Sequence, residues 1–184
     1  MKKIFYGAIL ISFSILFRTL WHLAPNVEFV TAASLLASFY LGKRYAVLVP
    51  FISIVASDLI IGNSNIYLFT WTGFLIIGVL AIIFEKLRKI KNLAGVKKIA
   101  LGLSFGLVSS LWFYLFTNFG VWFLDSWGMY PKTLTGLISC YIAGIPFLKL
   151  NLIGNMVFIP LSLFTAEKIR ILNLSSKKKF FRLE

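Results

Sequence analysis

Long apolar runs separated by clusters of lysine and arginine are the feature that most constrains this chain. A helix that crosses a membrane needs about 20 mostly apolar residues, and the runs repeat at close to this length. The chain has 184 residues, of which 59% are hydrophobic and 14% are charged. Allowing for loops, it holds at most about six or seven spans. We therefore predict a single integral membrane domain over residues 1–184, without a soluble nucleotide-binding or catalytic domain.

Six of the apolar runs are long enough, or nearly long enough, to be spans. We expect them at about 4–20, 29–41, 45–61, 66–84, 99–119 and 150–166, followed by a basic cytoplasmic tail at 167–184. A further apolar stretch, 134–147, is shorter, and its length suits a short extra helix or a re-entrant segment better than a span. The predicted fold is therefore an all-α membrane protein with six transmembrane helices and a short non-spanning segment before the last one.

The distribution of charge supports the same count. The net charge of +13 could indicate binding to nucleic acid, but the basic residues lie between the apolar runs. Lysine and arginine favour the cytoplasmic side of a membrane. With six spans, all 19 basic residues except Arg18, Lys132 and Lys149 fall on that side. If 134–147 also crossed, the basic tail would lie outside, so we predict that both termini are cytoplasmic.

Residues suited to catalysis or to metal binding are scarce. The chain has one histidine, His22, and one cysteine, Cys140, and no glycine-rich phosphate loop. A nucleophile–base pair or a metal cluster is therefore not expected. We predict no enzyme activity, no cofactor and no metal site. Cys140 is expected to be a small buried hydrophobe, with a soft axial ligand to a cobalt-containing substrate as the alternative.

Polar residues collect where the runs meet the outer side. Asp58 is the most informative, because a carboxylate inside an apolar segment costs roughly 2.5–3.5 kcal/mol on insertion scales. Such a residue normally faces a cavity or a polar partner, so a structural Arg18–Asp58 pair and a ligand contact are both open. An aromatic belt at the interface is an alternative for Trp122 and Tyr130. The residues predicted to bind a ligand near the outer face are Arg18, Asp58, Asn118, Trp122, Tyr130, Asn151 and Asn155.

Two pairs of small residues have the spacing that lets helices approach closely. Ala8 and Ser12 form one pair, and Ala33 and Ala37 form the other. Small residues four apart favour close helix packing in membranes. We predict that both pairs pack tightly against neighbouring helices or another protein, and we assign all four residues as contacts with a partner protein.

Several stretches of the chain resemble an uncharacterised bacterial membrane family that looks related to the substrate-binding S components of energy-coupling-factor (ECF) vitamin transporters. Two strings carry most of the resemblance, Asn-Phe-Gly-Val-Trp at 118–122 and Tyr-Pro-Lys-Thr-Leu-Thr-Gly-Leu at 130–137. Further similar stretches are 25–33, 49–62 and 140–147. The match covers nearly the whole chain, but it does not indicate a particular substrate.

The resemblance implies a six-helix bundle in the bacterial plasma membrane with a ligand pocket near the outer face. It also implies a coupling protein and two cytoplasmic ATPases as partners, although a solitary transporter stays open. S components often use an Ala-xxx-Ala pattern in the first helix, which Ala8-Ile-Leu-Ile-Ser12 nearly matches. We expect a substrate-capture component for uptake of a vitamin or a related micronutrient. A structural or assembly protein and a membrane-embedded enzyme are the alternatives.

Overall fold

Helices make up all the regular structure of the part of the chain that is described. The structure, a computed structural model, describes residues 2–21, 24–62, 66–87, 95–125 and 128–180. No strand occurs in these ranges, so the prediction of an all-α chain is confirmed. The elements are α1 (Lys2–Thr19), α2 (Val30–Leu36), the π-helical turn η1 (Ala37–Leu41), α3 (Lys43–Ile61), α4 (Tyr67–Leu87), α5 (Val96–Leu124) and α6 (Leu134–Phe180).

Four helices of the described part are long and apolar enough to cross a membrane. They are Lys43–Ile61, Tyr67–Lys86, Val96–Leu124 and Leu134–Arg170, which cover the last four predicted spans. The apolar helix Val30–Leu41 is shorter. At about 1.5 Å per residue it is only about 18 Å long, less than the hydrocarbon thickness of about 30 Å. The composition and lengths are typical of an integral membrane protein, and the count of six spans stays a prediction.

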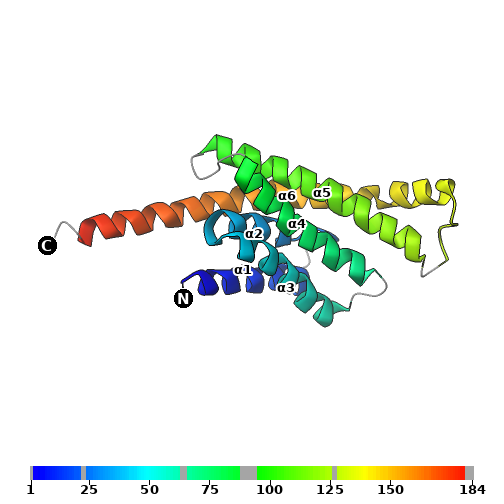
Figure 1. The fold of residues 1–184 in the computed structure, drawn as a ribbon, viewed down its shortest axis with the longest axis horizontal. Coiled ribbons are helices and arrows are strands. Elements are labelled where there is room, and N and C mark those ends of the chain that lie inside the picture. The colour runs from blue at the N-terminus through cyan, green and yellow to red at the C-terminus, as the bar shows by residue number, and fades with distance from the viewer. Residues whose placement is uncertain (1, 22–23, 63–65, 88–94, 126–127, 181–184) are drawn as a thin grey trace.

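The two ends of the bundle differ in which parts of the chain they hold. The N-terminus and the C-terminus lie at the same end, which we call the terminal end (Figure 1). The loop between α5 and α6 lies at the opposite end, and α1 stops partway towards it (Figure 1); we call this half of the bundle the loop end. Helices α3 to α6 run in alternating directions, and α1 runs in the same direction as α3 (Figure 1).

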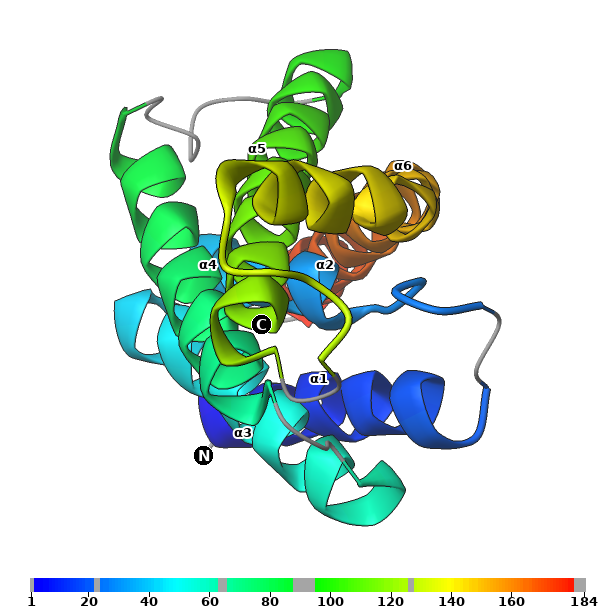
Figure 2. The ribbon, with the colours of Figure 1, turned by 90° about the vertical axis from the view of Figure 1, so that its right-hand side faces the viewer.

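The short helix α2 lies in the centre of the bundle, surrounded by the other helices (Figure 2). All seven of its residues are buried. Two hydroxyl groups here bond to the backbones of neighbouring helices. Ser34 Oγ of α2 donates to the Ala46 carbonyl at 3.0 Å, and Ser38 Oγ of η1 donates to the Ala81 carbonyl at 3.0 Å. Small side chains let helices approach, and hydroxyl groups on them find partners across the contact.

This central position corrects one prediction. Ala33 and Ala37 have no exposed surface, so they cannot contact a partner protein in this structure. Their small side chains instead allow α3, α4, α5 and α6 to pack around α2 and η1. The other predicted pair, Ala8 and Ser12, lies on an exposed face of α1.

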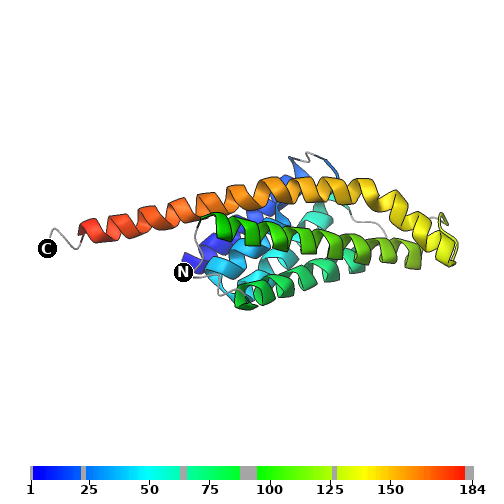
Figure 3. The same ribbon diagram turned by 90° about the horizontal axis from the view of Figure 1, so that it is seen from above.

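The last helix corrects a second prediction. Residues 134–147 and 150–166, expected as separate segments, belong to one continuous helix, α6, which contains Pro146 and Pro160. A proline removes one helical hydrogen bond, but packing against a neighbouring helix can keep the helix intact. Here the first part of α6 packs along α5, where Tyr114 Oη donates to the Tyr141 carbonyl at 2.6 Å. With 47 residues, α6 is about 70 Å long and projects past the bundle at the terminal end (Figure 3).

Glycines permit the closest helix contacts. A Cβ atom placed on Gly106 of α5 would lie 2.6 Å from Ile159 Cδ1 of α6. On α4, a Cβ atom on Gly78 would lie 2.7 Å from the Ala46 carbonyl oxygen of α3. Real Cβ atoms do not come so close to other groups. The two glycines therefore allow α5 to pack closely on α6 and α4 to pack closely on α3. Residues from these four helices form much of the site described next.

Candidate functional site

A cavity of about 440 Å³ lies at the loop end of the bundle. This volume is within the range of roughly 300–1,000 Å³ found for small-molecule pockets. Apolar and aromatic side chains form much of its wall, and a few polar groups interrupt them. The lining residues are Phe17, Arg18, Ala24, Pro25, Asn26, Val27, Glu28, Ile61, Ile66, Thr70, Phe113, Thr117, Asn118, Val121, Tyr130, Cys140, Ala143, Gly144 and Phe147.

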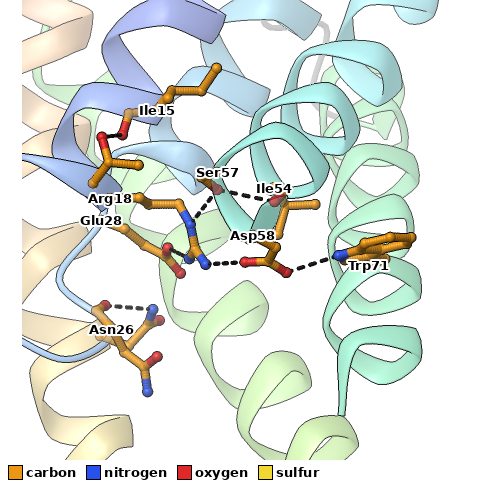
Figure 4. Close-up of polar contacts among 10 residues, drawn as sticks. Ile15, Arg18, Asn26, Glu28, Ile54, Ser57, Asp58 and Trp71 are labelled. Carbon is orange, nitrogen blue, oxygen red and sulfur yellow. Dashed lines mark hydrogen bonds and ion pairs between the residues drawn. The ribbon is translucent and has the colours of Figure 1, made fainter. Parts of the chain in front are cut away.

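Arg18, in the last turn of α1, connects three parts of the chain at this end (Figure 4). Its Nη1 pairs with Glu28 Oε2, and its Nη2 donates to Asp58 Oδ1 at 2.7 Å. Its Nε donates to Ser57 Oγ at 2.8 Å. From α4, Trp71 Nε1 donates to Asp58 Oδ2 at 2.8 Å. We call these five residues the Arg18 network.

The Arg18 network shows that the predicted Arg18–Asp58 pair is present. Asp58 is 4% exposed and has a partner on each carboxylate oxygen, and it is not among the residues that line the cavity. Its position therefore suits it to hold α1, α3 and α4 together beside the cavity. Of the network, only Arg18 and Glu28 line the cavity wall.

Glu28 was not among the predicted site residues, and it carries the most unusual group of the site. It is 5% exposed, and its Oε1 atom is buried without a hydrogen-bond partner. An unsatisfied buried acceptor is rare in native proteins and calls for an explanation. The sequence carries little signal for it, because Glu28 lies in the connection between the first two apolar runs, where an acidic residue is ordinary.

Asn118 of α5 lines the cavity as predicted. Its Nδ2 donates to the Tyr114 carbonyl at 2.8 Å. A Cβ atom on Gly144 of α6 would overlap the Asn118 side chain, so the amide needs a glycine opposite it. Cys140, also in the wall, is buried, and its Sγ donates to the Asn118 carbonyl at 3.3 Å.

A small annex of about 20 Å³ adjoins the cavity and shares five lining residues with it. That volume is enough for about one water molecule. Asn151 lines the annex, and its Nδ2 donates to the Asn26 carbonyl at 3.0 Å. Asn155 lines neither space: its Nδ2 donates to Ser110 Oγ at 2.9 Å and to Asn151 Oδ1 at 3.2 Å. Of these predicted residues, Asn151 therefore borders the annex, as Asn118 also does, and Asn155 supports it.

The two predicted aromatic residues have different positions. Tyr130 lines the cavity, and its backbone N–H donates to Asp125 Oδ1 at 3.0 Å. Trp122 does not line the cavity. Its Nε1 donates to the Pro131 carbonyl at 3.0 Å, and Lys132 Nζ lies 5.5 Å from its ring centroid. Trp122 therefore holds the loop between α5 and α6.

Of the seven residues predicted to bind a ligand, Arg18, Asn118 and Tyr130 line this cavity. Among the described residues, no group of three or more histidine, cysteine, aspartate and glutamate side chains could hold a metal ion. The polar groups present can accept or donate hydrogen bonds and can neutralise charge. The arrangement is thus suited to binding a small molecule.

A second ionic cluster lies at the terminal end. Lys98 of α5, 4% exposed, pairs through Nζ with Glu167 Oε1 of α6. Tyr40 Oη donates to the same oxygen at 2.7 Å, and Arg170 Nη1 lies 3.6 Å from Glu167 Oε2. Lys98 Nζ also lies 4.7 Å from the centroid of the Tyr40 ring. We call these four residues the Lys98 cluster, and it joins η1, α5 and α6.

Comparison with curated proteins and with solved structures gives no match. One family model does match, and it covers residues 1–173, almost the whole chain. The chain therefore belongs to the Family of unknown function (DUF6580).

Proposed function

We propose that the chain is a substrate-capture membrane component that takes up a small molecule through the cavity at the loop end. The cavity of about 440 Å³ is the observation that carries the proposal. It combines aromatic walls with a few placed polar groups, which is the usual composition of a small-molecule site. The resemblance to ECF S components supports a vitamin or a related micronutrient as the substrate class.

The position of the cavity along the helices fits this role. Lys98 of the Lys98 cluster and Asn118 in the cavity wall are separated along α5 by about 30 Å, close to the thickness of a hydrocarbon core. The two polar regions would therefore lie at the two membrane boundaries. Basic residues gather at the terminal end, which supports cytoplasmic termini and a cavity that faces the outside.

Transport would need a source of energy outside this chain. In the proposed arrangement a coupling protein with cytoplasmic ATPases contacts the exposed face of α1 that carries Ala8 and Ser12. A solitary transporter is the alternative arrangement. Co-purification of ATPase subunits that is lost on Ala8→Leu together with Ser12→Leu supports the first, and co-purification that survives both changes contradicts it.

The deciding experiment measures the small molecules retained by the protein after mild detergent purification, by mass spectrometry. Ala143→Phe places an aromatic ring at the cavity wall, and we expect it to lower retention at least about tenfold, because the cavity volume is limited. Ile142→Phe is the matched control, since Ile142 is adjacent on α6 but 61% exposed and outside the cavity wall. Equal retention by both variants contradicts the proposed function.

One observation favours a second candidate, a structural or assembly protein. Many of the polar side chains at the loop end already bond to one another, as in the Asn26–Asn151–Asn155–Ser110 series. If no small molecule is retained by folded wild-type protein, this second function is the one supported.

A further inference from the structure

Among the described residues, the ionised side chains that meet beside the cavity are one guanidinium and two carboxylates. Arg18 is a single guanidinium between two buried carboxylates, Glu28 and Asp58. Asp58 accepts hydrogen bonds on both oxygens, from Arg18 and from Trp71. Glu28 binds Arg18 through Oε2 only, and its Oε1 is buried without a hydrogen-bond partner. The acceptor capacity left over in the Arg18 network therefore lies on Glu28, a residue of the cavity wall.

The rest of the described wall supplies no second cation that could neutralise this oxygen. Apart from Arg18 and Glu28, the lining residues are neutral. Phe17, Phe113 and Tyr130 contribute aromatic rings to the same wall. Aromatic faces attract cations, most strongly where water is excluded. A carboxylate oxygen in need of a donor and a wall rich in rings both favour a positively charged group.

We infer that the cavity selects a ligand that carries a protonated amine, which pairs with the incompletely paired Glu28 carboxylate while an aromatic or apolar part of the ligand lies against the rings. The inference rests on the proposed function, because it names the chemical class of the molecule that this same cavity captures. Hydrogen bonds from a charged donor to a carboxylate are about twice as strong as neutral ones. This one contact with Glu28 would therefore be enough to favour a charged ligand over a neutral ligand of the same shape.

Three probes that share one ring system test the inference. Tryptamine carries a protonated amine, tryptophol replaces it with a hydroxyl group, and N-acetyltryptamine replaces it with a neutral amide. Affinities are measured by isothermal titration with the full chain in lipid nanodiscs. We expect wild-type protein to bind tryptamine at least about tenfold more tightly than either neutral probe.

Glu28→Gln keeps the shape of the side chain and removes its charge. We expect this variant to bind tryptamine and tryptophol with affinities within about threefold of each other, since the charge-assisted contact is lost. Glu167→Gln is the matched control, because it removes one negative charge from the Lys98 cluster at the other end. This control should keep the wild-type preference. A preference for tryptamine that survives Glu28→Gln overturns the inference.

The comparison of the three probes on wild-type protein keeps the inference testable if Glu28→Gln does not fold. Equal affinities for the three probes, or no binding of tryptamine, overturn the inference. The proposed function is judged separately, by whether Ala143→Phe reduces retention of the molecules that purify with the protein. Retention that falls in Ala143→Phe, together with equal probe affinities, leaves the capture function standing and removes only the charge selection.

Discussion

The Arg18 network at the loop end and the Lys98 cluster at the terminal end differ in how completely their carboxylate oxygens are paired. Both bring a basic side chain of one helix to acidic groups from other elements. In the Lys98 cluster both oxygens of Glu167 have partners, because Lys98 and Tyr40 share Oε1 and Arg170 approaches Oε2. In the Arg18 network one oxygen of Glu28 has none.

The difference follows from what surrounds each carboxylate. The Glu167 side chain is 29% exposed, so water can also serve it, and its cluster acts as a tie between η1, α5 and α6. The Glu28 side chain is 4% exposed and borders the cavity. A buried, incompletely paired carboxylate is costly to keep. A ligand that binds in the cavity could supply the missing partner, whereas a carboxylate that only connects helices gains nothing from being incompletely paired.

The largest effect is expected from Arg18→Met. This change removes the only basic member of the Arg18 network and leaves Glu28 and Asp58 buried without it. Breaking a buried pair in this way costs about 3–5 kcal/mol. We expect the free energy of unfolding to fall by about this amount, measured by denaturant titration of the protein in detergent micelles. A loss below about 1 kcal/mol contradicts the description of these ion pairs as buried.

A smaller effect is expected from Lys98→Met at the terminal end. Tyr40 still donates to Glu167, and the partial exposure of Glu167 allows water to replace the lost donor. Hydrogen bonds to charged groups contribute about 1.5–3 kcal/mol, so the free energy of unfolding should fall by no more than this. Retention of small molecules should not change. If Lys98→Met destabilises the protein more than Arg18→Met does, the contrast between the two ends is wrong.

The smallest effect on stability is expected from Gly144→Ala, which sharpens the description of the loop end. The added methyl group overlaps the Asn118 side chain in the cavity wall. Overpacking of this kind costs about 1–3 kcal/mol. Asn118→Ala made in the same chain should recover most of the loss, because it removes the overlapping amide. A double-mutant cycle on the free energy of unfolding measures the coupling, and additive effects would show that the two residues do not meet.

The sequence determined the features that depend on each residue by itself. Runs of apolar residues indicated helices of membrane-spanning length, and α3 to α6 cover the last four of them. A carboxylate within such a run needs a polar partner in any apolar surrounding, so the sequence predicted either an Arg18–Asp58 pair or a ligand contact, and the pair is present. Asn118 and Tyr130 were found in the cavity wall for a related reason, since polar groups at the ends of spans gather at a common depth.

Only the tertiary structure decided which apolar surroundings each residue has. Ala33 and Ala37 look like a partner-binding face in sequence, but α2 lies at the centre of its own bundle, because lipid and protein interior are equally apolar to a small side chain. The continuity of α6 through Pro146 depends on its packing along α5. The unpaired oxygen of Glu28 depends on how Arg18 divides its donors between two carboxylates. These three features depend on contacts between residues far apart in the sequence, and a hydropathy pattern along the chain does not report such contacts.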